Sequence, residues 1–303
     1  MASSNRPQAR RGPSGAWTRL KPAVIDPLDV YGLPLHDHKT QELFFQKITD
    51  RYMKFIATSG GGEQLDKAFA SLTVQPPPLT TSEPSNDKRG PSSDRPTLPR
   101  QPSTTPRPND MPKILMAMRG LREGILGSQR RDRFAQRAYM FIIQASILSR
   151  HWESYQPALL YLLHEIHPAT PLSSTDLQDF VGYRVLDLAC RQYELMEAFV
   201  VQKAFGLDDR RVQAVVMCLV RDDWVRFWRS KRAVDGYQRA IMEFAVERMR
   251  VHALKCLGRG YMSADRGFVE RSGGTSWAEL VKAGVGWRLQ DNGVVTIRTP
   301  KTK

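Results

Sequence analysis

Apolar residues recur at every third or fourth position along most of the chain after residue 110, with polar residues between them. This period is that of the α-helix, and no stretch before residue 285 alternates strictly as a half-buried strand does. Glycines, prolines and helix-capping residues interrupt the period and predict short turns. The expected helices cover 114–127, 134–148, 154–166, 174–190, 195–205, 212–220, 224–232 and 235–257.

The last and longest of these helices carries the clearest start signal. Asp235 stands at the N-cap position, and Gln238 follows three residues later, where its side chain can reach back to the cap. Neither proline nor glycine occurs between Tyr237 and Leu257. The apolar arc of this segment is wider than the stripe of an ordinary surface helix, so we expect packed neighbours on two of its sides.

The sequence after residue 258 predicts a small helix-helix-hairpin unit. Short helices are expected over 263–270, with Ser263 as the cap, and over 276–282. Two β-prone runs, 285–289 and 294–298, flank Asp291-Asn292-Gly293, and Asn-Gly between such runs is a strong hairpin signal. This order of elements is that of a winged helix, which requires Trp287 and Ile297 to lie on paired strands.

We therefore predict an all-α fold, in which stacked helical pairs similar to a TPR or HEAT array precede a C-terminal winged helix with a small β-hairpin. The first half of the chain differs in composition, because ten of the chain's 20 prolines lie between Pro76 and Pro108. The sequence leaves open whether an N-terminal helix over 38–58 packs on the main body. The expected segments are a disordered basic tail (1–35), an N-terminal helical segment (36–74, with a weaker helix over 63–72), a Pro- and Ser-rich disordered linker (75–110), the helical-repeat part (111–258) and the winged-helix part (259–300).

The net charge of +14 and the pI near 9.9 favour acidic partners, which include nucleic acid, anionic membranes and acidic protein surfaces. No apolar run approaches the ~20 residues of a membrane span, so no membrane partner is expected. Three widely spaced cysteines argue for a reducing compartment, the cytoplasm or the nucleus. Five basic residues precede the first acid, Asp26, as in a mitochondrial transit peptide, but prolines and glycines among them disfavour its amphipathic helix.

Three segments of the sequence resemble the PCI domain. Residues 221–228 look like the short aromatic helix that follows the helical array in that family, and 240–257 is similar to its long helix. The run 283–287, followed by 291–295, resembles the Gly-Trp, turn and strand of its wing. The similarity covers roughly 110–300 and is greatest to the branch of the proteasome lid regulatory subunit, the small signalosome subunit and subunit k of translation initiation factor 3. The basic charge and the Pro-rich linker depart from that branch.

This resemblance implies a non-catalytic scaffold subunit of a multi-subunit complex, of the proteasome-lid, signalosome or initiation-factor-3 type. Its partners would be other PCI-type subunits, which dock on the helical array and join their winged helices edge to edge. A hairpin that ends near Arg298 would leave an edge open to such a partner strand. The residues expected at this interface are Trp287, Val294, Val295, Ile297 and Arg298.

A nucleic-acid-associated PCI protein, of the mRNA export or processing type, is the alternative. Trp224, Phe227 and Trp228 alternate with cations, so bases could stack on the aromatic rings. The same spacing is also what a docked helix needs, with aromatic residues in the core and cations in solvent. The expected recognition helix, 276–282, carries Glu279 beside its single cation and is poorly equipped for phosphate contacts. The candidate basic residues are Arg226, Arg229, Lys231 and Arg232, with Arg130, Arg131 and Arg133 as a second cluster.

Other candidate chemistry has simpler structural explanations. His164 and His167 are three residues apart, unlike the His-Glu-x-x-His zinc motif, and no third ligand is evident. His252 lies in the apolar arc of the long helix, and each cysteine stands among apolar neighbours. The glycine clusters lack the context of a phosphate-binding loop. We therefore expect no catalytic residues, no metal and no cofactor, and predict that the protein is not an enzyme.

Overall fold

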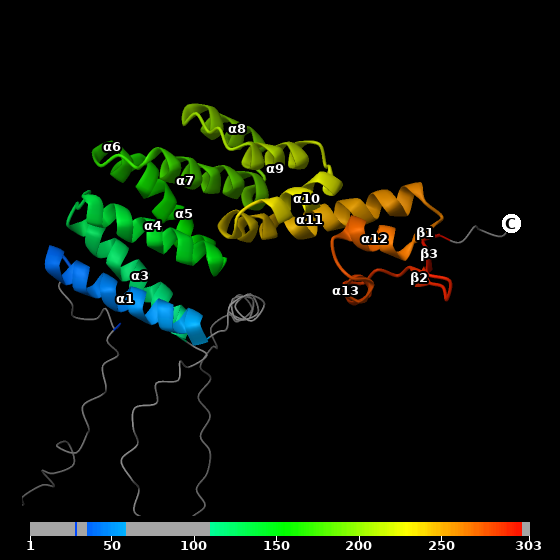
Figure 1. The fold of residues 1–303 in the computed structure, drawn as a ribbon, viewed down its shortest axis with the longest axis horizontal. Helices are drawn as coiled ribbons and strands as arrows, with labels where there is room; N and C mark the ends of the chain where they lie inside the picture. The colour runs from blue at the N-terminus through cyan, green and yellow to red at the C-terminus, as the bar shows by residue number, and fades with distance from the viewer. Residues whose placement is uncertain (1–27, 29–34, 59–109, 299–303) are drawn as a thin grey trace, which may run out of the picture.

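The computed structural model describes residue 28 and residues 35–58 and 110–298 (Figure 1). Helices make up most of this part of the chain, and a small three-stranded antiparallel sheet lies near its C-terminal end. The prediction of a mainly helical fold with a small β-hairpin is confirmed at this level. The expected weak helix over 63–72 and nearly all of the expected basic tail and Pro-rich linker fall outside the described residues. Leu28 and Leu35, which belong to the expected disordered tail, are instead buried in the main core.

The helical body contains every helix that the apolar period predicted. Two π-helical segments, η2 (Leu162–Ile166) and η3 (Asp187–Gln192), extend α5 and α7 and were not predicted. The α-helices of the body are α1 (His38–Thr58), α3 (Asp110–Gly127), α4 (Arg133–Leu148), α5 (Trp152–Tyr161), α6 (His167–Ala169), α7 (Ser174–Leu186), α8 (Leu195–Ala204), α9 (Arg210–Val220), α10 (Trp224–Ala233) and α11 (Gly236–Gly260).

Side-chain caps fix the starts of several helices. Asp235 accepts a hydrogen bond from the Gln238 amide at 2.7 Å, which confirms it as the N-cap of α11. The cap of α9 is Asp209, whose carboxylate accepts a hydrogen bond from the Arg211 amide. The predicted helix starts were therefore correct to within one or two residues at these positions.

Helix α1 packs against α3 as part of the same hydrophobic core, which answers the question that the sequence left open. The side-chain amide of Gln41, fully buried, donates to the Leu35 carbonyl at 2.7 Å, the Gly124 carbonyl at 3.1 Å and Ser128 Oγ at 2.9 Å. A Cβ at position 124 would stand 2.7 Å from the Leu35 carbonyl oxygen, so only glycine permits this approach.

Helix α11 is the central support of the molecule. It contacts α4, α7 and η3 in the body, α10 beside it and α12 in the small lobe that follows (Figure 1). Its buried residues occupy more than one side, as the wide apolar arc predicted. The position of the small lobe relative to the body is therefore set by one continuous helix of 25 residues. The buried apolar residues of α11 are Ile241, Met242, Ala245, Val246, Met249, Ala253 and Leu257.

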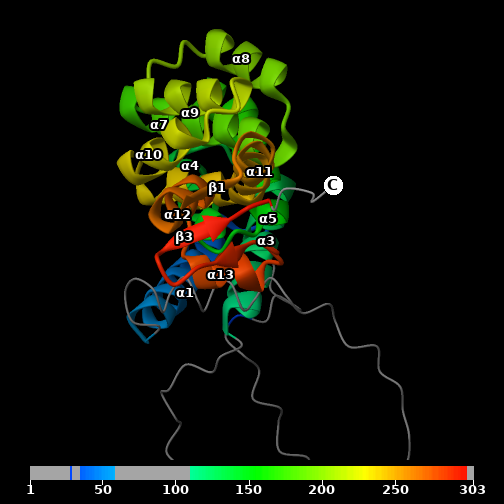
Figure 2. The ribbon, with the colours of Figure 1, turned by 90° about the vertical axis from the view of Figure 1, so that its right-hand side faces the viewer.

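The small lobe continues α11 with five short elements around a second, smaller core. The sheet order is β1-β3-β2 (Figure 1), and Val295 of the central strand pairs with Ala264 on one side and Leu289 on the other. Figure 2 views β1 and β3 from the end of the molecule at which the small lobe lies. Leu257, Val269, Leu280 and Val295 form the centre of this core. The elements are β1 (Ser263–Asp265), α12 (Arg266–Gly273), α13 (Trp277–Lys282), β2 (Arg288–Leu289) and β3 (Val294–Thr296).

Two details of the small lobe differ from the prediction. Residues 263–265 form a strand rather than the first turn of a helix, and Asp265, not Ser263, caps α12. The hairpin strands are also shorter than expected, so Trp287 and Ile297 each stand one residue outside the ladder. The requirement that both residues lie on paired strands is therefore not met, although the elements follow the expected order. Both side chains nevertheless pack against the small core.

Candidate interaction surfaces

The strand that was expected to offer a free edge is the central strand of the sheet. Strand β3 pairs with β1 on one side and with β2 on the other, so Val294 and Val295 have no open backbone edge. The side chain of Val295 is also fully buried. The hairpin therefore has an open backbone edge on β2 but not on β3, and the other open edge of the sheet belongs to β1. Binding of a partner strand at the hairpin stays a prediction.

The other expected interface residues attach the sheet to α11. The Arg298 guanidinium donates to the carbonyl of Gly258 at 2.6 Å and to that of Arg259, two of the carbonyls that the end of α11 leaves unpaired. The backbone amide of Ile297 donates to the Met262 carbonyl at 2.9 Å. The sequence did not predict β1, so it missed the exposed apolar residues at the two real edges. These are Tyr261 and Met262 just before β1, and Leu289 on β2.

The aromatic residues of α10 face the protein interior. Phe227 is fully buried, and Trp228 is 7% exposed, with its indole N–H donating to the Ser272 carbonyl at 2.9 Å. The backbone of Gly274 passes under the Trp228 ring at a φ of +66°, and a Cβ there would stand 2.7 Å from the ring. These rings join α10 to α12, so they cannot provide the stacking platform of the nucleic-acid hypothesis.

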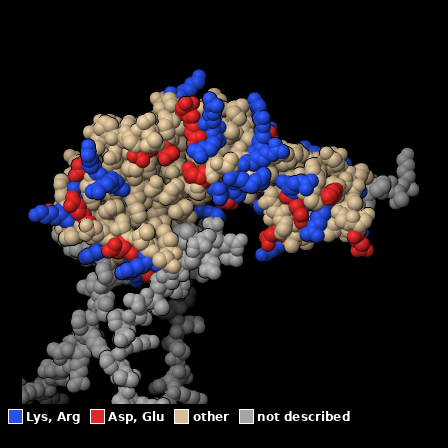
Figure 3. Space-filling view, viewed as in Figure 1, with Lys and Arg blue, Asp and Glu red and all other residues tan. Residues whose placement is uncertain are grey.

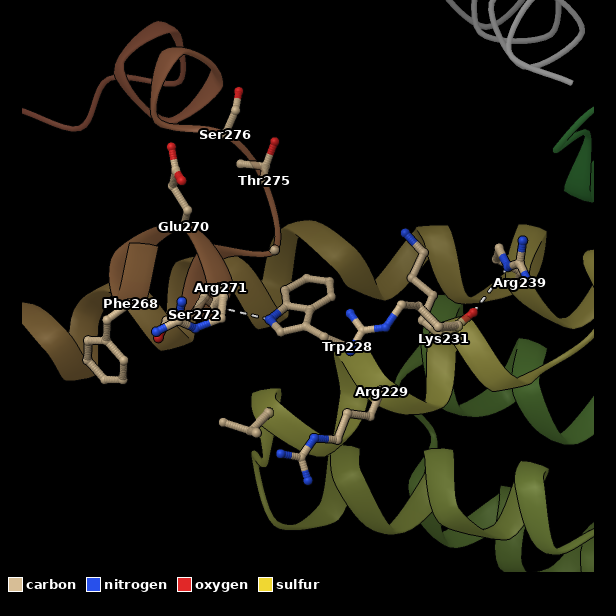
Figure 4. Close-up of a pocket in the computed structure, with 13 residues that line it drawn as sticks. Trp228, Arg229, Lys231, Arg239, Phe268, Glu270, Arg271, Ser272, Thr275 and Ser276 are labelled. Carbon is tan, nitrogen blue, oxygen red and sulfur yellow. Dashed lines mark hydrogen bonds between the residues drawn. The ribbon is translucent and has the colours of Figure 1, made fainter. Parts of the chain in front are cut away.

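The cations of α10 line a groove of about 890 Å³ between α10 and α12, which we call the α10–α12 groove (Figures 3 and 4). Figure 3 shows Lys and Arg side chains gathered over α9, α10 and α12. Trp228 and Phe268 are aromatic residues of its lining, and Thr275 and Ser276 contribute hydroxyl groups. Its cationic lining consists of Arg229, Lys231, Arg232, Arg239 and Arg271.

Two of these cations already have partners, whereas three do not. Lys231 forms an ion pair with Glu243 at 2.5 Å, and Arg239 donates to the backbone carbonyls of residues 231 and 234. Within the described part of the chain, Arg229, Arg232 and Arg271 form no ion pair. The predicted residue Arg226 lies outside this groove, in an adjoining hollow of about 360 Å³, and is 3.8 Å from the Asp223 carboxylate.

The single carboxylate that lines the groove is occupied by local contacts. Glu270 accepts a hydrogen bond from the Trp277 amide at 2.8 Å and another from Arg266 at 3.0 Å. The Trp277 bond, followed by the Arg266 contact, lowers the pKa of Glu270 below its ordinary value. The groove therefore retains a positive charge that its own carboxylate does not neutralise.

The second basic cluster lies elsewhere and does not form one surface. Arg130 is 7% exposed and ties α1 to the loop before α4 through Glu42 at 2.6 Å and Asp132 at 2.8 Å. Arg131 pairs with Glu165 at 2.7 Å, and Arg133 is exposed at the start of α4. Helix α1 and α12 lie at opposite ends of the molecule in Figure 1. The second cluster therefore does not extend the basic face of α10.

Helix α8 is apolar around most of its circumference but is buried at only one position, Ala198. It lies on the outside of the body in Figure 1. Met196 is 77% exposed and Val200 is 56% exposed, although both are large apolar residues. Leu195, Phe199 and Val201 of the same helix are half-buried against the main core, so the exposed apolar face of α8 consists of Met196 and Val200. The apolar composition of 195–205 was visible in the sequence, but its exposure was not.

The π-helical segment η3 contains a buried charged network that the sequence did not reveal. The Asp187 carboxylate, fully buried, accepts from Tyr155 Oη at 2.6 Å, Arg191 Nε at 2.6 Å and Gln192 Nε2 at 2.7 Å. Burial, and then the adjacent Asp187 charge, raise the pKa of Tyr155. The network is closed on itself and opens into none of the grooves described above, so we assign it to stability.

The histidines and cysteines considered for metal binding or nucleophilic chemistry each contact different neighbours and do not form one cluster. His167 Nδ1 accepts from the Leu172 amide at 3.1 Å, and His164 lies edge-on to Phe205. Cys190 is buried, which raises its pKa to about 12, whereas Cys256 is half-buried and 3.4 Å from His252 Nε2. Across 35–58 and 110–298, no group of three or more potential ligands is placed to hold a metal ion.

No described helix combines the length and the apolar character that a membrane span requires. The sequence matches no model of a known protein family, and no curated protein is significantly similar to it.

Proposed function

We propose that this protein is a non-catalytic scaffold subunit that assembles with other subunits of a multiprotein complex. The exposed apolar face of α8 carries this proposal, because burying Met196 and Val200 against a partner is the simplest source of binding free energy on the described surface. Each fully buried side chain of this size contributes about 1.5–3 kcal/mol relative to exposure. The helical body supplies the rigid support that such an interface needs.

The small lobe supports a PCI-type assignment within this proposal. Its elements follow the order α11-β1-α12-α13-β2-β3, which is the order of a winged helix. Its outer strands, β1 and β2, leave one backbone edge each for a strand from another subunit. On this basis the parent complex would be of the proteasome-lid, signalosome or initiation-factor-3 type, and the protein would act in the cytoplasm or the nucleus.

The nucleic-acid alternative receives less support from the geometry. Two of its three aromatic residues, Phe227 and Trp228, are buried, and the third, Trp224, is half-buried against the main core. Arg130 is occupied by α1, and Lys282 on α13 is accompanied by Glu279. The cations of the α10–α12 groove remain, but phosphate contacts alone carry no base recognition. A scaffold whose basic surface meets acidic protein explains the same charge.

A pull-down of the tagged chain from native cells, followed by mass spectrometry, tests the proposal. The double variant Met196→Glu with Val200→Glu should lose subunits of a PCI-type complex that the wild type retains at high salt and after nuclease treatment. Met116→Glu is the matched control, because Met116 is also an exposed apolar residue on a helix but lies on α3. Circular dichroism establishes that the variants are folded.

Two results would contradict the scaffold proposal. The first is that both α8 substitutions leave the recovered subunits unchanged. The second is that all associated proteins disappear on nuclease treatment, which would favour the nucleic-acid alternative.

A further inference from the structure

We propose that the α10–α12 groove is a docking site for an acidic peptide segment of a partner protein, with an apolar side chain among its carboxylates. This inference does not depend on the α8 interface or on the identity of the complex. It depends on the lining of the groove, on the rigidity of its walls and on the charge of the segments that could enter it.

The charge of the lining selects an anionic ligand. Five cations and one carboxylate line the groove, and the carboxylate of Glu270 is held by Trp277 and Arg266. Arg229, Arg232 and Arg271 are free of ion pairs with described residues and come from both walls, two from α10 and one from α12. Guanidinium groups bind carboxylates through two parallel hydrogen bonds, so three of them can hold two or three acidic side chains.

The apolar part of the lining distinguishes a peptide from a nucleic acid. Val225, which is 48% exposed, and Phe268 place apolar surface beside the free arginines. A single leucine or phenylalanine of a peptide can cover this surface while its acidic neighbours reach the cations. Bases would need an exposed aromatic face for stacking, and Trp228 turns its ring inward and uses its N–H on Ser272 (Figure 4).

The walls of the groove are fixed before a ligand arrives. The indole N–H of Trp228 holds α10 to the Ser272 carbonyl, and the Arg250 guanidinium holds α11 to the Gly273 carbonyl at 3.0 Å. The first bond joins the two walls directly, and the second holds the end of α12 on α11, which α10 also contacts. The backbone of the walls therefore loses little conformational entropy when a ligand binds.

The undescribed segments of the chain are poor matches for this lining. Residues 1–27 contain five basic residues and one acidic residue, and residues 299–303 contain two lysines and no acid, so both would be repelled by the free arginines. Residues 59–109 carry five acidic residues among six basic ones, and residues 29–34 carry one acidic residue. Charge complementarity thus points to a segment of another protein.

Fluorescence anisotropy with the full chain tests the assignment. The probe is a fluorescein-labelled ten-residue peptide of Asp and Glu with one central Leu, and a version with Gln and Asn in place of the acids is the uncharged comparison. We expect Arg229→Glu with Arg271→Glu to weaken binding of the acidic peptide by about tenfold or more. The uncharged peptide should bind more weakly than the acidic one by about tenfold or more. An acidic peptide with Gly in place of Leu should also bind measurably more weakly.

The matched control is Arg133→Glu with Arg137→Glu, which makes the same change in net charge on exposed positions of α4. It should change the affinity less than about threefold, because charges a Debye length or more away are largely screened. Equal losses in the two double variants would overturn the proposal in favour of non-specific attraction. Tighter binding of a labelled ten-nucleotide single-stranded RNA than of the peptide, lost in the groove variant alone, would overturn it in favour of nucleic acid.

Discussion

Arg130 and Arg131 are adjacent in the sequence and carry the same charge, yet the structure predicts that removing Arg130 costs much more stability than removing Arg131. Arg130 donates to Glu42 at 2.6 Å, to Asp132 at 2.8 Å and to the His38 carbonyl at 3.1 Å. Its guanidinium also lies 4.1 Å from the centre of the Phe134 ring. Arg130→Ala should therefore release the first turns of α1 from the body.

The size of this effect follows from the exposure of the partners. A hydrogen bond to a charged group contributes about 1.5–3 kcal/mol when it is buried, and the cation–π contact adds about 0.5–1 kcal/mol. The carboxylates of Glu42 and Asp132 are each 49% exposed, so water replaces part of what they lose. We expect Arg130→Ala to lower the free energy of unfolding by about 3 kcal/mol. This value is at the lower end of the ~3–5 kcal/mol that breaking a fully buried ion pair costs.

Arg131→Ala is the internal control. Its ion pair with Glu165 joins side chains that are 46% and 44% exposed, and such pairs contribute about 0–1 kcal/mol. Urea unfolding followed by tryptophan fluorescence gives both free energies, and hydrogen exchange of the α1 amides locates the loss. Arg130→Lys, which keeps the charge but loses the planar fork, should fall between the two. Arg130→Ala and Arg131→Ala values within about 1 kcal/mol of each other would refute the reasoning.

Three further substitutions test other parts of the structure. Gly274→Ala should lower the free energy of unfolding by about 3 kcal/mol, because the new Cβ strains the backbone and clashes with Trp228. Gly206 has a φ of +60° but open space around it, so Gly206→Ala should cost about 1 kcal/mol in the same urea experiment. Asp187→Asn should lower the free energy of unfolding by about 3 kcal/mol in a thermal unfolding experiment, because it removes the buried carboxylate from two half-buried arginines, Arg184 and Arg191. An unchanged midpoint would contradict this. Because its folded pKa is depressed, Glu270 contributes stability that is complete above its ordinary pKa and is lost as the pH falls through the folded value. The difference in midpoint between wild type and Glu270→Gln should therefore shrink as the pH is lowered below about 4.5, and a constant difference would contradict it.

The helical body could be predicted from the sequence because the signals for each helix lie within that helix and its caps. The 3.6-residue period and caps such as Asp235 depend on residues within one turn of each other. The packing of α1 on α3 depends instead on Gln41 meeting Gly124, which are separated by the whole segment 59–109. No local pattern records such a contact, and the sequence left the question open for that reason.

The errors in the candidate sites have the same physical origin. Strand β1 is three residues long and takes its identity from pairing with β3, about thirty residues later, so no period could show it. Its absence from the prediction made β3 seem to be an edge. Arg130 has the composition of a surface cation, and only the approach of Glu42 from α1 makes it a buried one. The cations of α10 were predicted as a basic surface. The groove itself could not be predicted, because its second wall is α12, which is distant from α10 in the sequence.

The two proposed surfaces differ in how they would gain affinity, and this difference follows from what fixes each of them. The face of α8 offers apolar area, whose burial depends little on salt. The α10–α12 groove offers charge between walls that Trp228 and Arg250 already hold, so its ligand gains mainly Coulombic energy, and that energy is screened as salt rises. A complex that forms through α8 would survive high salt, while a segment bound in the groove would be released. One chain can thus keep its place in an assembly and still exchange an acidic partner.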